Sequence, residues 1–213
     1  MTTPVLQIIE FYKILEKLCQ VKRDNLMTDG RHETDSDHMF KLCFLVMMIT
    51  PYLKKKVDYA KMLELALVHD IVEAKSGDVS LSAQYDNPKV KAKKIADEKE
   101  AIEHYKKILP SPLGDNVYDL FMEYENKSTR EAQIVYILDK LDAHLQANMY
   151  SDGDIRYWAD CPNGHMYYEM VSGKVSRREE KWVKAVDEEI LKELEDICLK
   201  ISQDNMKKCG IKV

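Results

Sequence analysis

The stretch Leu65–Asp78 reads Leu-Ala-Leu-Val-His-Asp-Ile-Val-Glu-Ala-Lys-Ser-Gly-Asp, an apolar helical run that closes with a group of polar residues. These polar residues are His69, Asp70, Glu73 and Asp78. In a continuous helix, Glu73 lies four residues after His69 and three after Asp70, so the three side chains share one face. A hydrophobic helix that gathers such groups predicts a metal site or a proton-transfer site.

The composition bounds the class of protein. The chain has 213 residues, of which 45% are hydrophobic and 32% are charged, so it can fill one large core and we expect a single domain over residues 1–213. The net charge of -5 arises from acidic and basic residues mixed along the whole chain. Without a basic field to neutralise phosphates, a nucleic acid duplex is excluded as the expected partner.

The hydropathy and the cysteines indicate a compartment. The longest apolar run, Leu42–Ile49, is far shorter than the roughly 20 residues of a membrane helix, and the N-terminus does not resemble a signal peptide. The five cysteines are scattered and form no Cys-x-x-Cys motif, which is typical of reduced thiols. We therefore expect a cytoplasmic protein that does not associate with membranes.

The apolar periodicity predicts an all-α bundle of about six to eight helices. Residues 21–35 are polar and are expected to form a loop, and no alternation is long enough to predict a sheet. Residues 150–175 contain glycines and many aromatics and are expected to form one long irregular segment, a lid or a subunit contact. Proline, capping residues and glycine set the expected helices at residues 4–20, 36–50, 59–76, 88–109, 112–125, 129–149 and 177–209.

Two further residues complete a candidate metal site. His38 lies in the first turn of the helix over 36–50, and Asp139 borders the apolar face of the helix over 129–149. An unpaired charge beside a core costs several kcal/mol, which a metal ion offsets. His38, His69, Asp70 and Asp139 form a nitrogen and oxygen set that suits Mn, Fe, Co, Ni or Zn and leaves positions open for water and substrate. Such a site predicts hydrolysis.

The order and spacing of these residues resemble the HD-domain metal-dependent phosphohydrolase superfamily. More narrowly, the chain resembles the 5′-deoxynucleotidase-like branch of that superfamily from about Arg23 to Tyr150. The His-Asp pair alone is a weak signal because it occurs by chance in many proteins, whereas the ordered set is specific. The matching positions are Arg23, Glu33, Ser36-Asp-His38, Leu67-Val-His-Asp70, Glu73, Gly77-Asp78 and Asp139.

The resemblance implies one divalent metal ion in an all-helical domain that usually forms a homodimer. The ligands implied are His38, His69, Asp70 and Asp139. It also implies a substrate, a nucleoside 5′-monophosphate, which is hydrolysed to nucleoside and phosphate.

The resemblance further implies roles around the metal. Glu73 would orient or deprotonate the attacking water, and Arg23 would clamp the phosphate with its planar donor fork. Asp78 would accept a hydrogen bond from the 3′-hydroxyl of the sugar. Asp24 stands where the best-known bacterial members have a tryptophan, so their strict selection of deoxyribose does not carry over.

Three alternative functions remain open at this point. A nucleoside triphosphate hydrolase of the same superfamily would need more cations around the phosphate tail than Arg23, with Lys75, Lys89 and Lys91 as the nearby candidates. A cyclic-nucleotide phosphodiesterase would need further histidines for a second metal. A helical binding protein with a structural metal would show no hydrolysis to lose.

Each assignment also has an ordinary structural explanation. Glu73 could be a solvated acid at a helix end, Asp78 a turn residue after Gly77, and Arg23 a surface partner of Glu33 or Asp37. Asp142 and His144, close to Asp139, are expected at exposed helix positions and are not assigned to the site.

Overall fold

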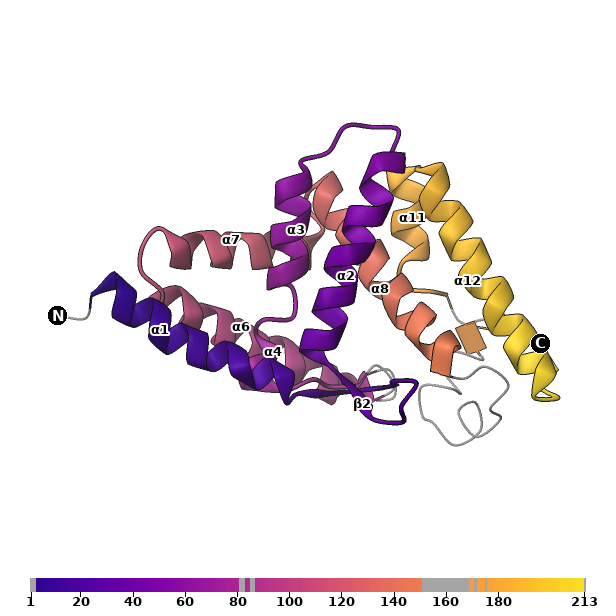
Figure 1. Cartoon of the computed structure of the whole chain (residues 1–213), viewed down its shortest axis with the longest axis horizontal. Helices are drawn as coiled ribbons and strands as arrows, with labels where there is room; N and C mark the ends of the chain where they lie inside the picture. Colours follow the sequence, from indigo (N-terminus) through magenta and orange to yellow (C-terminus); the bar gives the residue numbers. More distant parts are fainter. Residues whose placement is uncertain are drawn as a thin grey trace.

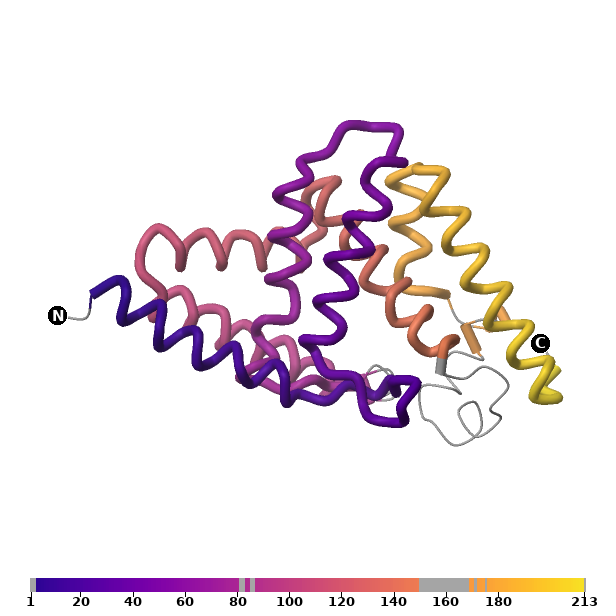
Figure 2. The backbone as a smooth tube through the Cα atoms, viewed as in Figure 1, coloured from indigo at the N-terminus to yellow at the C-terminus, as the bar shows by residue number. Residues whose placement is uncertain are grey.

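The computed structural model describes residues 3–80, 83–84, 87–150, 169–170, 172–174 and 176–212, with the side chain of residue 150 left out. Helices dominate these residues, so the predicted all-α class is confirmed. The N-terminus and the C-terminus lie at opposite ends of the molecule (Figure 2). The longer helices are α1 (Pro4–Leu15), α2 (Asp35–Ile49), α3 (Tyr59–Val68), α6 (Pro88–Ile108), α7 (Leu113–Asn126), α8 (Arg130–Tyr150) and α12 (Glu189–Lys208).

Local capping explains where several helices begin. The Thr3 hydroxyl accepts a hydrogen bond from the Leu6 amide at the start of α1, as a good N-cap does. At the start of α2, Thr34 and Asp37 form a reciprocal capping box in which each side chain accepts from the other residue's amide. Helix α2 ends just before the 3₁₀ helix η2 (Thr50–Tyr52), which contains Pro51. A short 3₁₀ helix, η1 (Glu16–Cys19), likewise follows α1.

The prediction that residues 21–35 form a loop is wrong. Strands β1 (Lys22–Leu26) and β2 (His32–Thr34) form an antiparallel hairpin in which Lys22 pairs with Thr34. Gly30 has a φ of +87°, which glycine adopts without strain, and it turns the chain between the strands. The strands are too short to show an alternation of apolar and polar residues. The inward-facing position of β1 is also polar, because the Asn25 side chain packs inward and donates to the Ala143 carbonyl of α8.

The prediction of a single helix over residues 59–76 is also wrong. Helix α3 ends at Val68, and the short helix α4 (Glu73–Ser76) begins after a turn. Within this turn the amide of Glu73 donates to the Asp70 carbonyl, which is the tighter i to i−3 bonding of a 3₁₀ turn. His69, Asp70 and Glu73 therefore do not share one helical face, and the turn decides how they point.

The helix predicted over residues 177–209 consists of two helices. Helix α11 (Glu180–Val186) ends at Asp187, whose φ of 55° is left-handed, and α12 follows. The backbone break places the Glu188 carboxylate where it accepts from the Lys54 and Lys55 amides and pairs with Arg130. These tertiary contacts supply hydrogen bonds and a counter-charge to the buried Glu188 carboxylate. In a continuous helix the carboxylate would point elsewhere.

Two apolar clusters meet at α2 and α3. These two helices lie side by side at the centre of the molecule (Figure 1). One cluster draws on α2, α3, α7, α8, α11 and α12, and the other on α1, α2, α3, α4, α6 and α7. Within α3, Leu65 belongs to the first cluster and Val68 to the second, and Leu42 and Met39 of α2 divide in the same way. The boundary between the clusters therefore passes the ends of α2 and α3 that carry His38 and His69.

Most of the segment expected to be irregular, residues 150–175, lies outside the described residues. Among the helices that the structure describes, each is too short or too polar to cross a bilayer.

Candidate active site

Three helices bring three of the predicted ligands together. His38 comes from the first turn of α2, His69 from the C-cap of α3 and Asp139 from the middle of α8, and all three are buried. The His38 Nε2 atom lies 3.2 Å from both His69 Nε2 and Asp139 Oδ1. Ligands about 2.1 Å from a tetrahedral ion lie about 3.4 Å apart, so this spacing fits a divalent metal.

Asp70 completes the set from one side. Its Oδ2 atom lies 3.1 Å from His69 Nε2 and 3.7 Å from His38 Nε2. Burial would raise the pKa of Asp70, but the attraction of His69 and Arg23 outweighs it and holds this pKa well below its ordinary value. A carboxylate that stays ionised in a buried site is a suitable metal ligand.

Both imidazoles are fixed by hydrogen bonds from their other nitrogen. The Nδ1 atom of His69 donates to the Ala66 carbonyl over 2.9 Å. The Nδ1 atom of His38 lies 2.7 Å from Asp142 Oδ2. Each hydrogen bond leaves Nε2 directed at the cluster, and such outer partners are typical of histidines that bind metals.

The expectation that Asp142 and His144 are exposed is wrong, because both are buried. Asp142 orients His38, whereas His144 Nε2 lies 3.4 Å from Glu179 and away from the cluster. The signal for Asp142 was its place three residues after Asp139, on the same face of α8. Burial and the Arg23 charge would lower the pKa of His38, but Asp139 and Asp142 raise it to about 9.

Glu73 lies beside this cluster at the start of α4. It is buried, and its pKa is raised well above the ordinary value by burial and by the charges of Asp70 and Asp78. Lys94 of α6 donates to Glu73 over 3.0 Å and also pairs with Glu98, so it opposes this rise. Sequence reasoning missed Lys94, and its only signal was the spacing of four residues to Glu98 in α6.

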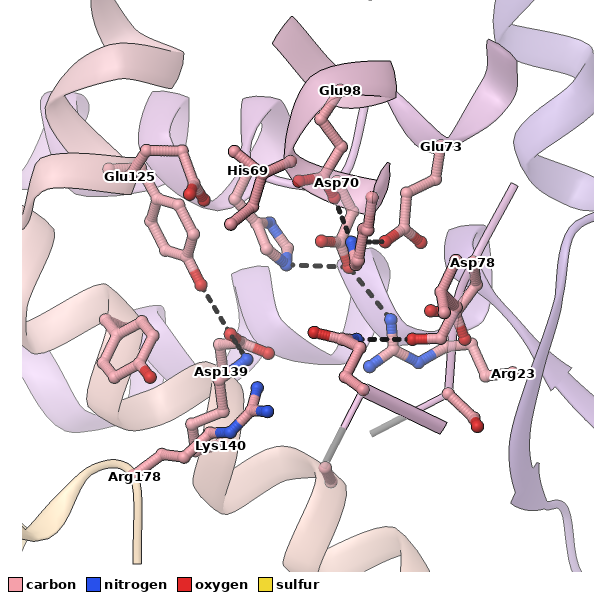
Figure 3. A pocket seen from close by; sticks show the side chains of 18 of the residues that line it. Arg23, His69, Asp70, Glu73, Asp78, Glu98, Glu125, Asp139, Lys140 and Arg178 are labelled. Atoms are coloured by element: carbon pink, nitrogen blue, oxygen red, sulfur yellow. Dashed lines mark hydrogen bonds and ion pairs between the residues drawn. The ribbon is translucent and has the colours of Figure 1, made fainter. Parts of the chain in front are cut away.

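Arg23 projects from β1 into a pocket of about 440 Å³. Its Nη1 atom donates to Asp70 over 2.9 Å, and its Nε lies 3.4 Å from Glu33. Asp78 lines the same pocket just after α4, beside Gly77, whose φ is +74°. Figure 3 shows Arg23 and Asp78 together at one end of the pocket, next to Asp70 and Glu73.

A buried carboxylate that the sequence did not indicate lies behind Arg23. Asp35, at the start of α2, is fully buried, and one of its oxygens lies 3.7 Å from Arg23. Burial and the charge of Asp70 raise the pKa of Asp35 to about 7. Asp35, Asp70 and Glu73 place carboxylate oxygens within 4.8 Å of one another, so the site concentrates negative charge on the Arg23 side.

The family follows from a comparison with known proteins, in which a model of the HD domain matches residues 15–189. The chain belongs to the HD-domain family. Relatives of this HD domain include the 5′-deoxynucleotidase HDDC2 of Xenopus laevis, which is 35% identical over 147 residues that cover 68% of this chain and 70% of the relative. The Homo sapiens protein of the same name is 33% identical and has 69% of its length covered.

Solved structures share the HD-domain fold. A structure titled as a predicted metal-dependent phosphohydrolase from Magnetospirillum magnetotacticum aligns with a TM-score of 0.71 over 98% of both chains, at 20% identity. The PH0347 protein of Pyrococcus horikoshii aligns with a TM-score of 0.60 over 92% of this chain and 98% of that one, at 26% identity. The family implies a divalent metal, and the His38, His69 and Asp139 cluster is one that could bind it.

The opposite end of the HD-domain pocket carries cations that sequence reasoning missed. Lys127, Lys140 and Arg178 line it together with Tyr136. Figure 3 shows Lys140 and Arg178 below Asp139, across the pocket from Arg23. The only signal in the sequence was that Lys140 follows Asp139. The candidates considered from sequence were Lys75, Lys89 and Lys91, and only Lys91 lines the pocket.

Proposed function

We propose that this HD-domain protein is a metal-dependent phosphohydrolase that removes the 5′-phosphate of nucleoside 5′-monophosphates. The observation that carries the proposal is the convergence of His38, His69, Asp70 and Asp139. All but the fully buried His38 line one polar pocket together with Glu73. The 5′-deoxynucleotidase relatives support the same reaction and favour it over a triphosphate hydrolase or a non-catalytic binding protein.

In this proposal, His38, His69, Asp70 and Asp139 hold one divalent ion, which we expect to be Mn, Co, Fe, Ni or Zn. When bound, the ion lowers the pKa of a water molecule and polarises a phosphoryl oxygen. The burial of His38, His69 and Asp139 shields these ligands from bulk water, while the partly exposed Asp70 borders the pocket. Asp142 and the Ala66 carbonyl hold the two imidazoles in the orientation that binding needs.

Glu73 is the proposed proton acceptor. Its raised pKa makes the carboxylate a stronger base than an exposed glutamate, because protonation relieves the repulsion of Asp70 and Asp78. Lys94 donates to Glu73 and favours the ionised carboxylate, the form that would accept the proton of the attacking water. Proton transfer by such a group contributes roughly 10² to 10⁴ in rate.

Arg23 and Asp78 are the proposed substrate-binding residues. The guanidinium of Arg23 has donors left over after its contact with Asp70, and these face the pocket where a phosphate would sit. Asp78 lines the same end and would accept a hydrogen bond from the sugar 3′-hydroxyl. Positioning and charge neutralisation carry most of the rate in phosphoryl transfer.

The test is phosphate release from a panel of nucleoside 5′-monophosphates with each candidate metal. We expect activity in the parent protein, loss of it in Glu73→Gln, and retention in Glu100→Gln, which removes an exposed carboxylate on α6. A parent protein that releases triphosphate from nucleoside triphosphates but no phosphate from the monophosphates would refute the proposal, as would full activity in Glu73→Gln.

We also propose a homodimer. Phe40, Phe44, Met47 and Met48 lie four, three and one residues apart along α2 and are 45–65% exposed, so they form an apolar stripe on its outer face. The rings of Phe40 and Phe44 lie 5.0 Å apart. A contiguous exposed patch of this kind is typical of a surface that another chain covers.

The domain organisation and the compartment are also proposals. We propose one domain over residues 1–213, because α2 and α3 each contribute to both apolar clusters. We propose a reducing compartment such as the cytoplasm, because Cys19, Cys43 and Cys198 form no disulfide within the part of the chain that the structure describes.

A further inference from the structure

Three cations form a group at the end of the pocket opposite Arg23. Lys127 and Lys140 approach the same ring, with Nζ atoms 4.4 and 5.1 Å from the Tyr136 centroid. Arg178 is close enough that its charge acts on both Lys127 and Tyr136. We call Lys127, Lys140 and Arg178 the cationic subsite.

The charges of the cationic subsite are only partly compensated. Among the residues that the structure describes, no carboxylate forms an ion pair with Lys127 or Arg178. Lys127 donates to the backbone carbonyl of Glu125. Burial lowers the pKa of Lys127, the charge of Glu125 opposes this shift, and the charges of Lys140 and Arg178 add to it. Lys140 lies 2.6 Å from Asp139, whose carboxylate is a proposed metal ligand and would share its charge with the ion.

The backbone of Lys127 adopts a conformation that costs free energy. Lys127 closes α7 with a φ of 49°, a left-handed conformation that is uncommon for residues other than glycine, asparagine and aspartate. A strained residue that presents a partly buried cation to a pocket is a pattern found at ligand sites. An anion that bound here would relieve the repulsion among the three cations.

We propose that the cationic subsite binds a second phosphate group, next to the one held beside the metal ligands, so that nucleoside 5′-diphosphates and triphosphates occupy the pocket as competing ligands. This inference rests on the proposed function, because the proposed ligand Asp139 fixes where the first phosphate lies. The chain of cations leads outward from Asp139 through Lys140 to Lys127 and Arg178, as a phosphate tail would require. Arg23 and Asp78 at the other end are left for the monophosphate and its sugar.

The two arms of the experiment are pyrophosphate and orthophosphate, which carry no base or sugar. Their affinities are measured by isothermal titration calorimetry on Co²⁺-loaded protein in a Glu73→Gln background, which prevents turnover, and the metal content is checked afterwards. One extra charge-assisted contact is worth enough for pyrophosphate to bind about tenfold more tightly than orthophosphate.

Two variants test the subsite directly. Lys127→Asn removes the charge with a residue that tolerates the left-handed backbone, and Arg178→Gln removes the second unpaired cation. We expect each to reduce the preference for pyrophosphate to about threefold or less. Lys181→Gln is the matched control, because Lys181 is exposed over the Trp182 ring and does not line the pocket. It should keep the full preference.

Several results would overturn the inference. These are equal affinities for the two anions in the parent, a preference that survives both variants, or the same loss in Lys181→Gln. The variants could also weaken orthophosphate binding as much as pyrophosphate binding. The three cations would then contact the first phosphate, and the inference would again be overturned. Phosphate release from nucleoside monophosphates, measured separately with Glu73 intact, reports on the proposed function alone. A protein that lacks this release but keeps the pyrophosphate preference would refute only that function.

Discussion

His38 and Asp142, which are 104 residues apart in the sequence, lie 2.7 Å apart at Nδ1 and Oδ2 inside the protein. The carboxylate holds the imidazole of α2 against α8 and leaves its other nitrogen for a metal. Asp142 contacts the Nδ1 side of His38, whereas His69 and Asp139 face its Nε2 atom. It is therefore a positioning residue rather than a ligand.

Asp142→Asn should weaken the metal affinity about 10- to 100-fold, the usual cost of losing an outer carboxylate. The amide keeps the size of the side chain but lacks the charge that favours the required tautomer of His38. Competition with a fluorescent chelator measures the change. Asp196→Asn on α12 is the control, and an affinity equal to that of the parent in Asp142→Asn would contradict the assigned role.

The Lys94 contact with Glu73 predicts a change in pH dependence. Glu73 must be ionised to accept a proton, and loss of the nearby cation raises its pKa further. In Lys94→Gln, the acid limb of the kcat/KM profile should therefore move to higher pH. Lys93→Gln, which removes an exposed cation paired with Asp97, should leave the limb in place. A limb that moved to lower pH would exclude Glu73 as the base.

Asp35 predicts a pH-dependent stability of the metal-free protein. Because its pKa rises from 3.8 to about 7 on folding, the folded state binds the extra proton. The stability from Asp35 is full below about pH 4 and is lost as the pH rises through about 7. Asp35→Asn should thus raise the free energy of unfolding at pH 8 by up to about 4 kcal/mol, with a much smaller gain at pH 4.

Asp37 serves as the control of opposite sign for that experiment. Its pKa is lowered, chiefly by the hydrogen bond from Arg31, so its contribution is present at neutral pH and is lost at low pH. Asp37→Asn should destabilise the protein at pH 7 and change little at low pH. Urea unfolding across this pH range measures both variants, and equal pH slopes in Asp35→Asn and the parent would refute the assignment of Asp35.

Asp24 should set the sugar preference. It lines the pocket beside Arg23, and a short carboxylate there is able to accept a hydrogen bond from a 2′-hydroxyl. Asp24→Trp should raise the kcat/KM ratio of deoxynucleotide to ribonucleotide about tenfold, because the ring removes this acceptor and the space around it. Asp24→Asn keeps both and should change the ratio little. An unchanged ratio in Asp24→Trp would place the sugar elsewhere.

The apolar stripe of α2 predicts how the chain assembles. Phe40→Ser combined with Phe44→Ser should convert a dimer into a monomer, since these exposed rings would lose the burial that holds two copies together. Light scattering after size exclusion measures the mass. Ile197→Ser on α12 removes an equally exposed apolar residue and should not change it. A parent protein that is monomeric would refute the dimer.

The local rules of helix formation made much of this protein predictable. Capping residues and prolines act within one turn, so the starts of α1, α2 and α6 follow from the sequence. The types and order of the site residues were enough to identify the family, which the match over residues 15–189 confirmed. The same local rules failed at the turn after Val68 and at Asp187, where tertiary contacts break an apolar pattern that continues.

The sequence by itself determined the helical class, the family and the set of residues available for chemistry. Only the tertiary structure decided which side chains meet: His38 with Asp142, Glu73 with Lys94, and Lys127 with Lys140 around Tyr136. The physical reason is that helix propensity is set by neighbours within four residues. Burial, ion pairing and the pKa values that follow depend on helices that pack together from distant parts of the chain.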